Sequence, residues 1–158
     1  VTPRNLYYSV ISSYSRVSAI GDFLYGLVLC LIFYHKSILL CLLFSIIGAS
    51  IVKAFAVILN SLAFWITRSD DFANSLLGSF ISFSIYPDTV FNKFIRVLMY
   101  TVLPVGFAVF LPVNIIMNFN IYYFIIVILF TIMINQISHL VFNKGIRRYS
   151  SSNLMVSR

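Results

Sequence analysis

The stretch from Ile121 to Phe142, with the sequence IYYFIIVILFTIMINQISHLVF, decides the class of this protein. As a helix, its 22 residues extend about 33 Å, enough to cross a hydrocarbon layer of about 30 Å. Backbone groups inside lipid must find partners within their own segment, and a run of this length does so only as a helix. Segments of about ten residues that alternate apolar and polar, which mark barrel strands, are not seen. The stretch therefore predicts a helix that crosses a membrane.

Three further apolar runs precede this one, and the whole chain has the composition of a membrane protein. Its residues are 61% hydrophobic and 9% charged, against about 45 to 50% and 25% in soluble domains. We predict an all-α polytopic membrane protein with one transmembrane domain over residues 1–158. Its four transmembrane helices are expected at about 17–34, 38–66, 94–117 and 121–142. Residues 144–158 are predicted to form a cytoplasmic tail, with a polar, flexible end from Tyr149 onward.

The basic residues follow the same division of the chain. Nine of the eleven lysines and arginines lie in alternate gaps between the runs: Arg4, Arg16, Arg68, Lys93, Arg96, Lys144, Arg147, Arg148 and Arg158. Because short basic loops stay in the cytoplasm during insertion, this pattern predicts a multi-pass protein of the cell membrane with both ends of the chain inside. A net charge of +7 spread over three loops, rather than gathered in one stripe, argues against nucleic acid as a partner.

Two stretches between the runs are amphipathic rather than spanning. In the first, Pro3 is well placed to open a helix, and apolar residues recur at three- and four-residue steps up to Val17. In the second, a stripe of apolar side chains from Phe72 to Phe83 follows the capping group Ser69, Asp70 and Asp71. Both are predicted on the cytoplasmic face. Two hypotheses stay open: helices in the headgroup layer, or docking elements for a cytoplasmic partner.

Lys53 is the one basic residue inside an apolar run. It lies about 24 Å from Ser37 and about 18 Å from Trp65 along a helix, and a cation at such depth costs on the order of 3 kcal/mol. Two hypotheses stay open for it. It binds an anionic group in a translocation path, to which Asn60 and Asn135 also contribute, or it snorkels or pairs with a polar group of a neighbouring helix.

Other residues with chemical potential do not form a catalytic set. His139 shares a helical face with Asn135 and Asn143, but no nucleophile, carboxylate or further metal ligand stands at a recognisable spacing from it. The sequence therefore predicts no catalytic residue and no metal site. It also has no Gly-rich phosphate loop, so we expect no nucleotide hydrolysis by this chain alone. Pro104 and Pro112 interrupt the third run and predict kinks, which are candidate hinges.

Several short motifs occur in a fixed order along the chain. Ser61-Leu62-Ala63-Phe64-Trp65 closes a run, Ser84-Ile85-Tyr86-Pro87 follows, then come Leu103-Pro104 and Leu111-Pro112, and Lys144-Gly145-Ile146-Arg147-Arg148-Tyr149 ends the series. This order resembles the carboxy-terminal part of an ABC type-2 (ABC-2 family) transporter permease, the membrane subunit of a bacterial ATP-driven exporter. The residues that carry the family motifs are Trp65, Tyr86, Pro87, Arg147, Arg148 and Tyr149.

The resemblance implies a role and partners. Such permeases have six spans and export a substrate across the bacterial inner membrane by alternating access, so two spans are expected before Val1, where the chain begins without a methionine. They work in pairs of identical or related permeases, in contact with membrane lipids and with a separate ATP-binding subunit. That subunit holds ATP and Mg, and no cofactor is expected on this chain. The residues implied to couple to the ATPase are Pro3, Arg4, Tyr14 and Arg16.

Lys53 departs from the family pattern, which has an apolar residue at that place. Two other classes of function also stay open. An intramembrane lipid-modifying enzyme would use His139, and a non-transporting assembly subunit would need none of these polar residues.

Overall fold

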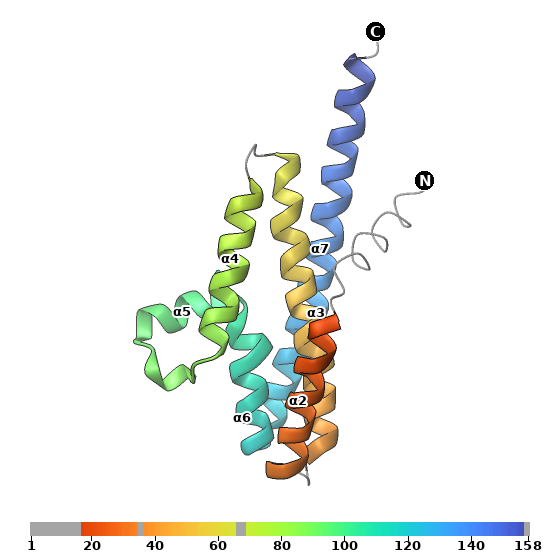
Figure 1. The fold of residues 1–158 in the computed structure, drawn as a ribbon. Helices are drawn as coiled ribbons and strands as arrows, with labels where there is room; N and C mark the ends of the chain where they lie inside the picture. The colour runs from red at the N-terminus through yellow and green to blue at the C-terminus, as the bar shows by residue number, and fades with distance from the viewer. Residues whose placement is uncertain (1–16, 35–36, 66–68, 157–158) are drawn as a thin grey trace. The chain divides into compact units, whose positions relative to one another are not determined.

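The structure, a computed structural model, describes residues 17–34, 37–65 and 69–156, and these are helical with no strand among them. The predicted all-α fold is confirmed for this part of the chain (Figure 1). Pro3 to Arg16, the first predicted amphipathic segment, lies outside the described residues. The elements are α2 (Val17–Phe33), α3 (Ile38–Ser61), η2 (Leu62–Phe64), α4 (Ser69–Ser84), η3 (Asp88–Val90), α5 (Lys93–Thr101), η4 (Gly106–Phe110), α6 (Leu111–Met117) and α7 (Ile121–Val156).

The chain divides into two compact units, residues 1–43 and 44–158, and α3 runs from one into the other. The first unit holds α2, whose side chains from Phe23 onward are apolar and mostly exposed, such as Tyr25 at 67% and Phe33 at 71%. A helix that is apolar all round belongs in lipid or in the core of a larger assembly. A short turn follows α2, in which the Ser37 N–H donates to the carbonyl of Tyr34 at 2.9 Å.

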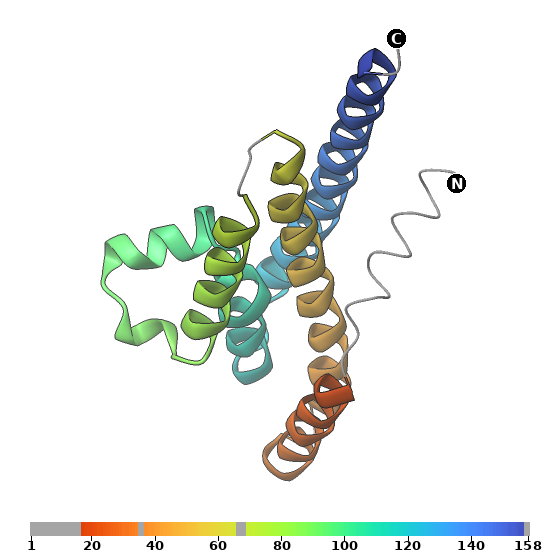
Figure 2. The same ribbon diagram turned by 45° about the horizontal axis from the view of Figure 1, so that its top comes forward.

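In the second unit, α3 and α7 lie side by side and run in the same direction (Figures 1 and 2). Near one end the rings of Phe44 and Phe124 meet edge to face with centroids 5.9 Å apart, and near the other end Phe64 meets Phe142 at 6.4 Å. Both helices carry buried residues: Ile51 and Ala54 on α3, and Val127, Ile134, Ser138 and Phe142 on α7.

Helix α4 returns along α3 in the opposite direction. Phe80 is buried and its ring lies 5.9 Å from that of Phe55, while Ala73 near the start of α4 is also buried. The predicted helix over residues 72–83 is therefore confirmed, but its inner face is turned from the predicted stripe, because Phe72 is 55% exposed.

The predicted helix over 94–117 is wrong as a single element. The chain forms α5, then the π-helical turn η4 and α6, and the axis bends by 89° between Thr101 and Gly106. The N–H groups of Val102 and Leu103 both bond to the carbonyl of Leu98, which closes α5. Pro104 has no N–H to continue the ladder, and its carbonyl instead accepts from Ala108 at 3.0 Å and so begins the next helix.

The second proline of this region produces a close helix contact rather than a break. Pro112 has no N–H to bond to the carbonyl of Ala108 four residues earlier, and the π-helical turn directly precedes it. That carbonyl approaches α3 so closely that a Cβ built on Gly48 would lie 3.0 Å from it. Glycine at position 48 therefore lets the backbones of α3 and η4 meet.

Length and composition qualify two helices as membrane spans, Ile38–Ser61 and the Ile121–Arg147 part of α7, and the bent pair α5 with η4 and α6 makes a third if it counts as one span. Apolar residues Ile20–Phe33 of α2 form a shorter helix. The described residues thus contain two or three candidate spans where four were predicted. Helix α7 continues through Tyr149 to Val156, and the cytoplasmic location of the tail stays a prediction.

We predict that replacing Gly145 by alanine destabilises the α7 contact with η2. A Cβ at Gly145 would overlap the ring of Phe64, and overpacking of this kind costs about 1 to 3 kcal/mol of unfolding free energy. Gly78→Ala in α4 is the matched control, because nothing lies within 4 Å of its Cβ position. In detergent, the unfolding temperature of Gly145→Ala should be lower than that of the wild type. The unfolding temperature of Gly78→Ala should equal or exceed that of the wild type. Equal stability of the two variants would contradict the contact, and Phe64→Leu should rescue Gly145→Ala in part.

Candidate functional site

A polar seam crosses the apolar contact between α3 and α7. The Asn135 Nδ2 donates to the Ser50 Oγ at 2.9 Å and to the carbonyl of Thr131 at 2.8 Å, which ties the two helices together near their middle. Both Ser50 and Asn135 are half-buried. In lipid such a bond between helices is worth about 0.6 kcal/mol on average, because the separated helices also find partners. The bond sets the register of α3 against α7.

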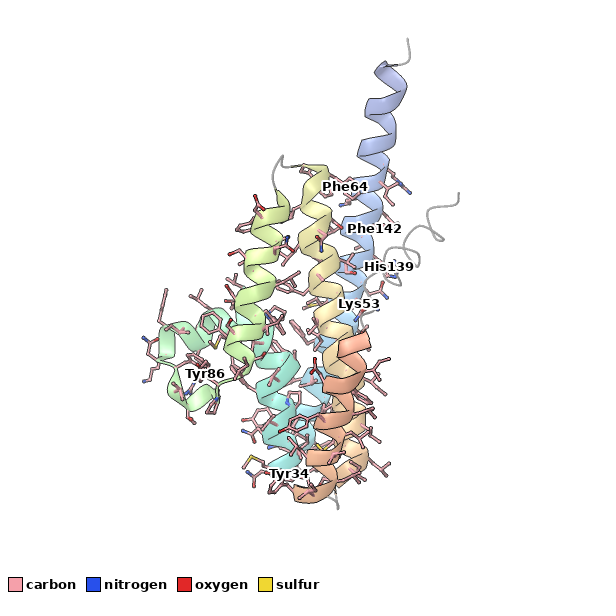
Figure 3. The ribbon with its side chains drawn as sticks, viewed as in Figure 1. Tyr34, Lys53, Phe64, Tyr86, His139 and Phe142 are labelled. Carbon is pink, nitrogen blue, oxygen red and sulfur yellow. The ribbon has the colours of Figure 1, made fainter. Side chains whose placement is uncertain are left out.

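One helical turn beyond this pair, the seam continues with Lys53 on α3 and His139 on α7. Because the two helices run in the same direction, residues three or four places after Ser50 and Asn135 reach about the same level. Figure 3 shows Lys53 and His139 at nearby heights on the two helices, with Phe64 and Phe142 beyond them. Lys53 is half-buried and His139 is exposed, so both lie at the edge of the contact. Among the described residues no carboxylate forms an ion pair with Lys53.

Ser138 lies inside the contact and has an unusual environment. It is fully buried, and its Oγ has no hydrogen-bond partner among the described residues. Most buried hydroxyls in helices donate to a carbonyl of the preceding turn, as Ser61 does to Val57 at 2.6 Å in this chain. The seam thus holds one satisfied polar pair and, a turn further on, one hydroxyl without a partner.

The structure does not bring Asn60 to this group. It is exposed two turns beyond Lys53, and its amide donates to the carbonyl of Ala56 in its own helix at 2.8 Å. The assignment of Lys53, Asn60 and Asn135 to a substrate path stays a prediction, as does any role of the buried Pro104 and Pro112 as hinges. The Asn135 pairing with Ser50 could not be read from the sequence, because nothing in it gives the alignment of α3 with α7.

The family-motif residues fall at separate places. Trp65 is 38% exposed with its ring 6.3 Å from that of Phe64, and Tyr86 and Pro87 are exposed in the link between α4 and η3. Arg147 is exposed on α7, where Arg148 and Tyr149 follow as helix without described side chains. Pro3, Arg4, Tyr14 and Arg16 lie outside the described residues, so their predicted coupling role stays a prediction.

A second polar group, which the sequence interpretation missed, holds the start of α5. The Asn92 side chain accepts from the Ile95 N–H at 2.9 Å and caps the helix, and an Arg96 guanidinium nitrogen donates to the Asp88 carbonyl at 2.9 Å. The Nε of Arg96 is buried without a partner in the described part of the chain. Asparagine is a strong capping residue, so Asn92 was the available signal that a new helix begins there rather than continues.

The chemistry that these groups offer is binding and positioning. No group of three or more His, Cys, Asp or Glu side chains that could hold a metal ion occurs among the residues described. Cys30 and Cys41 are free thiols. What the second unit presents is a set of apolar helices with hydrogen-bonding groups and cations at a few defined levels.

The comparison with protein families places most of this chain in a known family. The profile of a family described as ABC-2 family transporter protein matches residues 4–153 of this chain. No curated protein and no solved structure gives a significant match.

We predict that Ser50 and Asn135 contribute to stability in a coupled way. In a double-mutant cycle, Ser50→Ala and Asn135→Ala should each lower the unfolding free energy, with a coupling of about 0.6 kcal/mol and at most about 2 kcal/mol. Asn60→Ala is the matched control, since its amide bonds only within α3, and it should change stability by less than about 0.5 kcal/mol. The measurement is reversible unfolding in mixed micelles. Strict additivity of Ser50→Ala and Asn135→Ala would rule out the bond.

Proposed function

Since this chain belongs to the family of ABC-2 transporter proteins, we propose that it is the permease subunit of an ATP-driven exporter. One observation carries the proposal: the family profile covers residues 4–153, nearly the whole chain. The apolar helices agree with it, because a transporter of this family is a multi-pass membrane protein and α3 and α7 are long enough to cross a bilayer. ATP is hydrolysed on a separate subunit, and a second permease completes the pathway.

In the proposed topology, α2, α3, the bent segment from Lys93 to Met117, and α7 each cross the membrane, and both ends of the chain are cytoplasmic. The alternation of basic gaps supports this orientation, because the short connections at 34–37 and 118–120 carry one lysine between them. The cytoplasmic side then holds the start of α4 and the part of α7 beyond Lys144. These elements, with the segment that contains Arg4 and Arg16, form the side available to an ATPase.

Export by alternating access requires two arrangements of the helices, and ATP can drive it only if the ATPase binds them with different affinity. A partner that is indifferent to the two arrangements shifts nothing. The segment around Pro104 is the element that we expect to change, since no continuous ladder of hydrogen bonds crosses it. In contrast, α3 and α7 are joined along their length and are expected to move together.

The direct test is association with an ATP-binding subunit. The permease, expressed with an ABC ATP-binding subunit from the same genome, should co-purify in a mild detergent and show ATP hydrolysis that vanadate inhibits. His139→Ala should leave both properties within about twofold of wild type, since no step is assigned to that side chain. A permease that never retains an ATPase would contradict the proposal. Loss of a lipid-modifying turnover in His139→Ala would favour the enzyme alternative instead.

A further inference from the structure

The helix α5 stands at a right angle to the segment that follows it. Its axis and that of η4 with α6 differ by 89°, with only residues 102–105 between them. The following segment is apolar and packs antiparallel to α7, as the stacked rings of Phe107 and Phe130 with centroids 3.8 Å apart show. If that segment, about 18 Å long, enters the bilayer along the membrane normal, α5 must lie close to the membrane plane.

The surface of α5 fits a membrane boundary. Met99 is buried against the rest of the unit, whereas Phe94, Val97 and Leu98 are exposed at 72%, 60% and 38%. The exposed side is therefore an apolar stripe, and it carries Lys93 at the start of the helix. Apolar side chains on one flank and basic groups beside them are the mark of helices that lie in the headgroup layer.

The register of η4 against α3 shows which residue of α3 lies level with the bend. The carbonyl of Ala108 meets Gly48, and the two elements run in opposite directions, so Pro104 lies at about the level of Val52, four residues further along α3. Lys53 therefore lies at the same height as the bend and α5.

Lys53 and the basic group of α5, Lys93, nevertheless lie on different flanks of the unit. Lys53 is five residues beyond Gly48, or about 140° around the helix, so it faces away from η4 and from the α5 that precedes it. Figure 3 agrees, with Lys53 beside α7 and Tyr86 of the α5 side at the opposite flank. Groups that bind one ligand in a pocket must converge. Basic groups at one height on opposite flanks are instead expected where a membrane surface surrounds the molecule.

We propose that α5 lies in the headgroup layer of the bilayer and that Lys93 and Lys53 bind the phosphates of anionic lipids at that level. The proposal accounts for Lys53 as a cation at the membrane boundary. It also explains the polar groups found beyond that level, such as the exposed Asn74 and Ser75 of α4. It rests on the multi-pass character of the chain and not on transport, so its failure would leave the permease proposal standing.

The depth of α5 can be measured with single tryptophans in brominated lipid bilayers. In the chain carrying Trp65→Phe, tryptophan is placed at Phe94 or Thr101, which share the exposed flank of α5, and at Val113 of α6 as the deep reference. We expect positions 94 and 101 to differ by less than about 4 Å in depth, both shallower than 113. A spanning helix would separate 94 from 101 by about 10 Å and would overturn the proposal.

The lipid contact is tested with spin-labelled phosphatidylglycerol in phosphatidylcholine. Lys93→Gln and Lys53→Gln should each lower the preference for the anionic lipid by about two- to fivefold. Lys93→Arg and Lys53→Arg keep the charge and should retain it. Unchanged selectivity in the glutamine variants would overturn the assignment of these lysines to lipid phosphates.

Discussion

Lipid offers no partner to a backbone N–H or C=O, and this constraint governs how the chain can be built. Wherever the sequence is apolar, the chain forms helix, because only the internal ladder satisfies these groups. The place where the ladder fails, Pro104, becomes the place where the chain turns. The turn is tolerated because Leu98, Leu103 and Pro104 supply carbonyls to the N–H groups around it, so the break leaves few backbone groups unsatisfied.

Packing between the helices depends on close approach of their backbones and on one polar bond. Apolar side chains gain little by leaving lipid for a helix contact, so shape and hydrogen bonds decide which helices meet. Gly48 allows the carbonyl of Ala108 to approach α3, and Gly145 allows the ring of Phe64 to approach α7. Asn135 and Ser50 then fix the alignment of the two long helices. Gly48 of α3 and Pro112 of α6 thus lie on the two sides of the same helix contact.

The sequence was informative about the elements whose cause is local. The apolar runs at 38–66 and 121–142 and the amphipathic segment at 72–83 predicted α3, α7 and α4, because hydrophobic length and period are properties of single segments. The right angle after α5 was not predicted, since a proline in an apolar run is compatible with either a mild kink or a full turn. The cap at Asn92 would have favoured the turn. The Ser50 to Asn135 bond, in contrast, depends on the register of two distant helices, which no local pattern contains.

The bend between α5 and η4 is the central claim, since the depth of α5 and the expected hinge both follow from it. It is tested most directly by the distance between spin labels at Phe94 and Met117, both exposed, in a chain with Cys30 and Cys41 replaced by serine. The helix from Phe94 to the bend is about 10 Å long, and the helix from the bend to Met117 is about 20 Å long. At a right angle, these lengths predict a separation of about 23 Å between the labelled backbones. A single distance distribution near 35 Å, the length of an unbroken helix over these residues, would contradict the account.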